Sequence, residues 1–142
     1  MLKLLIDTNV ILDVVLKRGQ RGIDGGLLLS AVQRQRAGGY VAAHSITTVH
    51  YIVERESGDA TARLAVTYIL QLLSVVPLGS NDFHAAVALG MPDFEDAVQA
   101  AAALAVPADY IVTGNKKDFR HSPVPSRSAA QILPLMLGPH AR

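Results

Sequence analysis

The stretch Leu2-Lys3-Leu4-Leu5-Ile6-Asp7-Thr8-Asn9 contains the pattern on which our prediction of the fold depends. Residues 2–6 are mostly apolar and are followed at once by three polar residues, which is typical of a buried strand in a parallel sheet. Residues 9–16 then carry apolar side chains at helical spacing. A strand that leads directly into a helix is the repeating unit of α/β domains.

The same alternation continues along the chain. We expect further strands at residues 40–43, 75–78 and 110–113, and a short edge strand at Val124. The glycine-rich and charged residues 17–26 predict a loop. Helices are expected at residues 27–37, 45–57, 60–73 and 80–89, from residue 93 to just before Pro107, and after Ser128, with Ser45, Asp59 and Ser128 as caps. This pattern predicts a single three-layer α/β domain over residues 1–142, with a central parallel sheet of four to five strands and helices on both faces.

The composition limits the possible functions. Half of the 142 residues are hydrophobic, and the absence of cysteine excludes disulfides, thiolate catalysis and zinc sites built on cysteine. The formal net charge of +1 is too small to hold nucleic acid by charge alone, so such a substrate would need metal ions and a few local cations. Asp7 interrupts the first apolar run too early for a signal-peptide core, and we expect a cytoplasmic protein without a membrane partner.

Polar residues follow the first and the fourth predicted strands. Asp7-Thr8-Asn9 ends the first strand, and Thr113-Gly114-Asn115 ends the fourth. Active sites in parallel sheets gather at the carboxyl ends of the strands, so these residues are candidates for one site. For Asp7 the alternative is a helix N-cap, which is common at a turn between strand and helix.

Three acids lie within four residues in Asp93-Phe94-Glu95-Asp96, just before an alanine-rich segment that we expect to form a buried helix. Asp93 and Asp96 are three residues apart and share a helix face, and we expect Glu95 to point elsewhere. The alternative is that Asp93 and Asp96 form an arrangement like a capping box.

Further candidate ligands are weaker. Glu54 shares a helix face with His50, and its alternative is a solvated helix end. Asn115 and Asp118 follow the fourth strand, where a turn would also explain them. Together with Asp7 and Asp96, these oxygen ligands at one end of the sheet favour Mg²⁺ or Mn²⁺ over zinc. The five histidines, at residues 44, 50, 84, 121 and 140, show no ligand spacing; only His50 is placed near the expected site, and a packed or exposed helix residue is the better reading for it.

Three segments give the chain a resemblance to a known family. They are Leu5-Ile6-Asp7-Thr8-Asn9-Val10-Ile11-Leu12-Asp13, Asp93-Phe94-Glu95-Asp96-Ala97 and Ile111-Val112-Thr113-Gly114-Asn115-Lys116-Lys117-Asp118-Phe119. In these segments, and across nearly its whole length, the chain resembles PIN-domain proteins, in particular the VapC-type toxins and their relatives.

The resemblance implies a PIN-like fold and a set of site residues. Asp7 would be the first metal-binding acid, and Asp96 the acid at the start of the buried helix. Asn9 would orient Asp7 or the ion, and Thr113 and Asn115 match the family's polar positions. The chain departs from the family at His50, where Glu is common, and at Asn115, where Asp is common. Glu54 and Asp118 would then be the helpers, and we expect one ion rather than two.

The implied activity is that of a Mg²⁺- or Mn²⁺-dependent endoribonuclease, which hydrolyses RNA phosphodiester bonds and serves as the toxin of a toxin–antitoxin pair. Its implied partners are an RNA substrate, a cognate antitoxin and a second copy of the chain. Lys116 and Lys117, with Arg18 and Arg21, are candidate phosphate contacts, and ordinary surface charge is their alternative reading.

Two other functions stay open from the sequence. The residues at His50 and Asn115 also fit a PIN-like RNA-binding or regulatory module without catalysis. A phosphatase with an aspartyl nucleophile would use Asp7, but such enzymes commonly have a second Asp at the position of Asn9.

Overall fold

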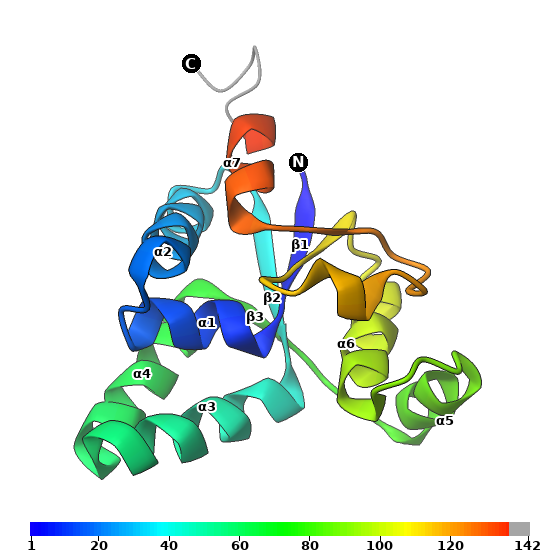
Figure 1. The fold of residues 1–142 in the computed structure, drawn as a ribbon, viewed down its shortest axis with the longest axis horizontal. Helices are drawn as coiled ribbons and strands as arrows, with labels where there is room; N and C mark the ends of the chain where they lie inside the picture. Colours follow the sequence, from blue (N-terminus) through cyan, green and yellow to red (C-terminus); the bar gives the residue numbers. More distant parts are fainter. Residues whose placement is uncertain (137–142) are drawn as a thin grey trace.

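The structure, a computed structural model, describes residues 1–136 and is built on a five-stranded, all-parallel sheet in the order β3-β2-β1-β4-β5 (Figure 1). The strands are β1 (Lys3–Ile6), β2 (Gly38–Ala42), β3 (Ser74–Val76), β4 (Tyr110–Val112) and β5 (Ser126–Arg127). The predicted α/β fold is therefore confirmed. The edge strand β5 begins two residues after Val124, at which it was predicted.

Successive side chains of the strands point to opposite faces of the sheet and divide the core in two. Leu4 and Ile6 of β1 belong to one hydrophobic cluster, and Leu5 belongs to the other. The first cluster is covered by α1 (Thr8–Val15), α2 (Gly19–Gln33), α3 (Ala43–Ser57), α4 (Asp59–Leu72) and α7 (Ala129–Met136). The second is covered by α6 (Phe94–Ala105), against which α5 (Ser80–Ala88) packs, and by the short 3₁₀ helix η1 (Lys116–Phe119). These two helix layers on either side of the sheet make the predicted three layers (Figure 1).

The segment at residues 17–26 was predicted to be a loop, and this was wrong, because α2 begins at Gly19. Its glycines allow close helix packing rather than breaking the helix. A Cβ atom on Gly22 would lie 2.5 Å from the carbonyl oxygen of Asp13, and one on Gly25 would lie 2.7 Å from Cγ2 of Val14. The absence of side chains at these positions lets α2 pack directly on α1.

The predicted caps are correct in part. Ser128 caps α7, since its Oγ accepts a hydrogen bond from the backbone N–H of Gln131 at 3.2 Å. Ser45 does not cap α3, because the helix begins two residues earlier and buries Ser45 within its first turn. Gly58, with φ at 88°, occupies the N-cap position of α4, and the predicted cap Asp59 is the first residue of that helix.

The strand order fixes the position of the candidate site. The chain crosses to β2 on one side of β1 and to β4 on the other, so the connections that leave the carboxyl ends of β1 and β4 diverge. Ligands of open α/β sheets bind at this point of divergence. Asp7 follows β1 and Thr113 follows β4, so the two candidate segments meet there. Within residues 1–136, every helix is too short or too polar to cross a membrane.

Candidate metal centre

Asp7 is a carboxylate buried at the carboxyl end of β1, with only 3% of its surface exposed. Its backbone N–H donates to the carbonyl oxygen of Val112 at 2.9 Å, and Thr113 Oγ1 donates to its Oδ2 at 2.9 Å. Asp7 occupies the N-cap position of α1, but its side chain makes no capping hydrogen bond. Burial raises the pKa of Asp7 to about 6, against the hydrogen bond from Thr113, which lowers it. The carboxylate is therefore held in place while its negative charge is poorly compensated.

Two acids at the start of α6, Asp93 and Asp96, have different roles. Asp93 is the N-cap, and its Oδ1 accepts a hydrogen bond from the backbone N–H of Asp96 at 3.0 Å. The capping alternative is thus correct for Asp93, and it leaves the carboxylate of Asp96 free. Burial and, in decreasing order, the charges of Asp93, Asp7, Glu95 and Asp118 together raise the pKa of Asp96 to about 7. Thr8 Oγ1, in the residue after Asp7, lies 3.1 Å from Nε2 of Gln99, three residues after Asp96, so the two predicted metal ligands lie on neighbouring segments.

The residues after β4 form a connected turn beside these acids. Thr113, which donates to Asp7, also accepts a hydrogen bond from the backbone N–H of Asn115 at 3.0 Å. The side-chain amide of Asn115 donates to Asp118 Oδ2 at 2.6 Å. Asn115 therefore holds Asp118, and the charge of Asp118 is near enough to raise the pKa of Asp96. Lys116 is turned toward α7, where its Nζ donates to Gln131 Oε1 at 3.0 Å.

The fold does not bring Glu54 to the acids of the candidate metal centre. Its carboxylate lies with the side chains of His50 and Asp59, at the corner where α3 leads into α4. The first turn of α3 contains two residues that contact α6, His44 and Ser45. Glu54 lies ten residues beyond His44, about 15 Å along the helix axis. The prediction that Glu54 replaces a family acid at the site therefore disagrees with its position.

Asn9 is exposed in the first turn of α1, and its side chain forms no hydrogen bond among the described residues. The residue that orients Asp7 is Thr113. A contact of Asn9 with a bound ion stays a prediction.

A buried polar network beside the acids was missed by the sequence-based reading. Glu95 does not point away from the group, because its Oε2 lies 2.5 Å from His44 Nε2 and accepts from Gln99 Nε2 at 2.9 Å. The other N–H of the Gln99 amide faces Ser45 Oγ at 2.9 Å and Thr8 Oγ1 at 3.1 Å, which share it. The signal that could have found the network is Gln99 itself, a polar residue in an alanine-rich helix, one turn after Glu95. His140 lies outside the described residues.

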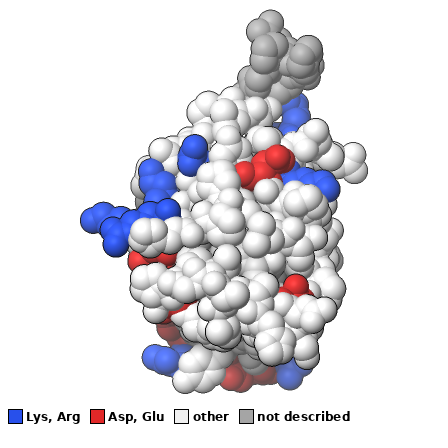
Figure 2. All heavy atoms as spheres, turned by 90° about the vertical axis from the view of Figure 1, so that its right-hand side faces the viewer, with Lys and Arg blue, Asp and Glu red and all other residues white. Residues whose placement is uncertain are grey.

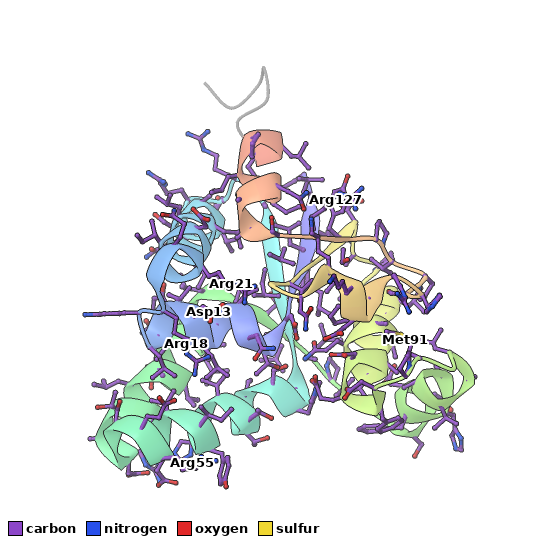
Figure 3. All side chains as sticks on the ribbon, viewed as in Figure 1. Asp13, Arg18, Arg21, Arg55, Met91 and Arg127 are labelled. Carbon is purple, nitrogen blue, oxygen red and sulfur yellow. The ribbon has the colours of Figure 1, made fainter. Side chains whose placement is uncertain are left out.

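Two hollows adjoin the acids. One, of about 190 Å³, is lined by acidic and basic side chains together: Pro92, Asp93, Asp96, Lys117, Asp118, Arg120 and His121. The other, of about 170 Å³, lies beyond Thr113 and includes Arg21, Asp13 and Asp24 in its lining. Figure 3 labels Arg21 together with Asp13. Arg21 lies against Gly114, where a Cβ atom would be 3.3 Å from the guanidinium.

The chemistry of these groups fits a hard divalent cation. Carboxylates crowd together here, and among residues 1–136 no lysine or arginine forms an ion pair with Asp7 or Asp96. Oxygen ligands of this kind suit Mg²⁺ or Mn²⁺, and the burial of Asp7 is unfavourable unless a cation or a proton compensates its charge. The acidic group can therefore hold a metal ion, for which Asp7 and Asp96 are the candidate ligands.

Comparisons with known proteins concern the fold and the family of the chain. The chain is similar in structure to VapBC2 from Rickettsia felis, solved bound to a DNA fragment from its promoter, with a TM-score of 0.68 and 14% identity over 89% of this chain and 98% of that chain. It is also similar to VapC20 from Mycobacterium tuberculosis, described as a toxin that cleaves the sarcin-ricin loop, with a TM-score of 0.64 and 13% identity over 76% of this chain and 86% of that chain. No curated protein matches the sequence.

These structural similarities concern the fold alone, because the identities are low. The sequence itself matches the family model of the PIN domain over residues 3–117, which includes Asp7, Asp96 and Thr113. This match leaves the phosphatase reading without support, and the chain belongs to the PIN-domain family.

Proposed function

We propose that this protein is a Mg²⁺- or Mn²⁺-dependent endoribonuclease and the toxin of a toxin–antitoxin pair. The observation that carries the proposal is the placement of Asp7 and Asp96, two carboxylates on neighbouring segments at the point where the strand connections diverge. Asp96 lines the hollow that Asp118 and three basic or imidazole side chains also line. Acids that hold an ion, beside cations that contact phosphate, are what hydrolysis of a phosphodiester requires.

Each residue of the site has a distinct task in this proposal. Asp7 and Asp96 would hold the ion, and Thr113 fixes the orientation of Asp7 through its hydroxyl. Asn115 fixes Asp118 in the same way through its amide. A bound divalent ion would supply activation of water and neutralisation of the charge that develops on the phosphate.

The phosphate contacts would come from Lys117, Arg120 and Arg21. The first two line the hollow beside Asp96, and Arg21 lies against Gly114 on the other side of Thr113. Arg18 is engaged elsewhere, since it lies 3.6 Å from Asp13 and 3.5 Å from Glu56. Lys116 donates a hydrogen bond to Gln131 of α7, and it would contact RNA only after this hydrogen bond breaks.

The partners and location of the protein are part of the same proposal. One of the structural relatives is a complex named VapBC2, and by analogy we infer a cognate antitoxin, encoded next to this gene, and a cytoplasmic location.

We also propose a homodimer, formed through the side of the protein that carries α5 and α6. Most of the surface on this side is uncharged (Figure 2), and Val87 and Phe94 are more than half exposed there, at 68% and 51%. Light scattering that gives the mass of one chain would reject the dimer.

The proposed activity is tested by incubating the purified chain with RNA and either ion. We expect cleavage by the unmodified protein and by the control Glu56→Gln, which removes an exposed acid of α3 outside the site. Asp7→Asn should abolish cleavage. Equal cleavage by Asp7→Asn would refute the proposal, and RNA binding without cleavage or ion binding would favour the non-catalytic PIN-like module.

A further inference from the structure

Helix α3 brings no carboxylate to the metal centre. Its first turn, which faces the start of α6, offers His44 and Ser45, and the acid Glu54 lies three turns away. The place beside Asp7 and Asp96 is instead reached by Glu95 of α6. One carboxylate oxygen from each of Asp93, Glu95 and Asp96 lies within 4.8 Å of the other two.

Glu95 is held from two sides. Its Oε2 lies 2.5 Å from His44 Nε2 and accepts from the amide nitrogen of Gln99 at 2.9 Å. A carboxylate only accepts hydrogen bonds, so both the imidazole and the amide must present an N–H to it. These contacts occupy one oxygen of Glu95, and its Oε1 has no hydrogen-bond partner among residues 1–136.

A buried hydrogen-bond network connects Glu95 to the residue after Asp7. Gln99 is fully buried, and its second N–H is shared between Ser45 and Thr8, the residue after Asp7. Thr8 Oγ1 in turn donates to Ser45 Oγ at 2.7 Å. Side chains of α1, α3 and α6 therefore fix Glu95 relative to Asp7, as hydrogen-bonded neighbours of a metal-binding carboxylate commonly do.

We propose that Glu95, oriented by His44 and Gln99, is a third metal-binding carboxylate of this centre and takes the place of an acid on α3. The inference rests on the proposed function, because it adds a ligand to the ion that Asp7 and Asp96 would hold. Glu95 is suited to the task because its side chain is 48% exposed, so a cation can reach the free oxygen from solvent. Asp93 is a poorer candidate, since its carboxylate caps α6.

The test is a titration of the full chain with Mn²⁺, in which binding is measured by calorimetry and by the electron paramagnetic resonance signal of the free ion. Glu95→Gln keeps an oxygen that can accept from His44 and Gln99, so the fold should persist in EDTA. We expect this variant to bind Mn²⁺ about 10- to 100-fold more weakly than the unmodified chain. Glu56→Gln removes an exposed acid on α3 and should leave the affinity unchanged.

His44 is a positioning residue in this proposal, and it has its own test. His44→Leu removes the N–H that holds Glu95 and should weaken Mn²⁺ binding roughly 10-fold. His44→Gln restores an N–H donor and should recover most of the affinity, which a purely structural role of the imidazole would not predict.

The outcomes separate the two proposals. If the unmodified chain binds Mn²⁺, Asp7→Asn does not, and Glu95→Gln binds as well as Glu56→Gln, the role of Glu95 is overturned and the proposed function stands. If the unmodified chain binds no Mn²⁺, the metal centre is overturned, and the role of Glu95 with it.

Discussion

Asp7→Asn should make the metal-free protein more stable while it destroys the metal centre. The amide of Asn has nearly the size of the carboxylate and can still accept the hydrogen bond of Thr113 through its oxygen. What the substitution removes is a negative charge that is 97% buried, beside the charges of Glu95 and Asp96. Stability and activity should therefore change in opposite directions.

The size of the gain follows from the pKa of Asp7. Burial raises this pKa from its ordinary value of 3.8 to about 6. A difference of roughly two pH units, at about 1.4 kcal/mol for each, corresponds to about 3 kcal/mol of unfolding free energy, taken as an upper bound. The folded state binds the proton more tightly than the unfolded state, so the penalty is absent below about pH 4, grows as the pH rises, and is complete above about pH 6.

The assay is thermal or urea unfolding in EDTA, at about pH 7.5 and again near pH 4. At the higher pH we expect the melting temperature of Asp7→Asn to lie above that of the unmodified chain by up to roughly 10 °C, from about 3–4 °C per kcal/mol for a domain of this size. Near pH 4 the two should nearly coincide. Saturating Mg²⁺ should then stabilise the unmodified chain alone, by about 2.7 kcal/mol when the free ion is at 100 times its Kd.

Two results would refute this reasoning. Asp7→Asn could prove no more stable than the unmodified chain at the higher pH, which would mean that the buried charge is compensated by groups of the protein. Alternatively, Asp7→Asn could keep the stabilisation by Mg²⁺, which would remove Asp7 from the metal centre. Glu56→Gln is the control, because it removes an exposed acid of α3 and should change neither quantity.

Three further predictions concern the same edge of the sheet and the core behind it. In EDTA the unmodified chain should lose stability as the pH rises from about 4 to about 7, because the raised pKa values of Asp7 and Asp96 make ionisation unfavourable in the folded state; a flat profile in urea unfolding would contradict this. Thr113→Val keeps the shape of a fully buried side chain but removes the hydroxyl that orients Asp7, and should weaken Mn²⁺ binding about 10-fold in calorimetry. Gly39→Ala would place a Cβ atom 2.6 Å from Cδ2 of Leu73 and should cost about 1–3 kcal/mol of unfolding free energy, whereas an unchanged urea midpoint would show that the core yields at this point.

The fold could be predicted from the sequence because its signals are local. The apolar run before Asp7 and the alternation that follows it specify buried parallel strands and covering helices without knowledge of distant contacts. The start of α2 could not be predicted in this way. Glycine has a low helix propensity, so the glycines of α2 argue against a helix when only the local sequence is considered. Their presence is explained by the close packing of α1 against Gly22 and Gly25, which leaves no room for side chains there.

The positions of the site residues also differ in whether local sequence patterns are enough to predict them. Asp7 and Thr113 follow neighbouring strands, so the rule for the carboxyl ends of parallel strands is enough to predict that they lie together. Glu54 was placed by analogy, and analogy supplies no position along a helix. The distance from the first turn of α3, about 15 Å at the usual rise per residue, is what separates Glu54 from the acids of α6.

Glu95 was misplaced because the face of a helix that matters depends on what packs against it. The spacing of Asp93 and Asp96 defined one face, and Glu95 was assigned to another, which is correct for an isolated helix. In the fold, however, the first turns of α3 and α6 meet, and His44 lies against the face that carries Glu95 and Gln99. A buried glutamine needs hydrogen-bond partners, so its position in the alanine-rich helix already marks the face that meets polar groups. Because Glu95 stands four residues before Gln99 on that face, the glutamine indicates which of the neighbouring acids is drawn into the site.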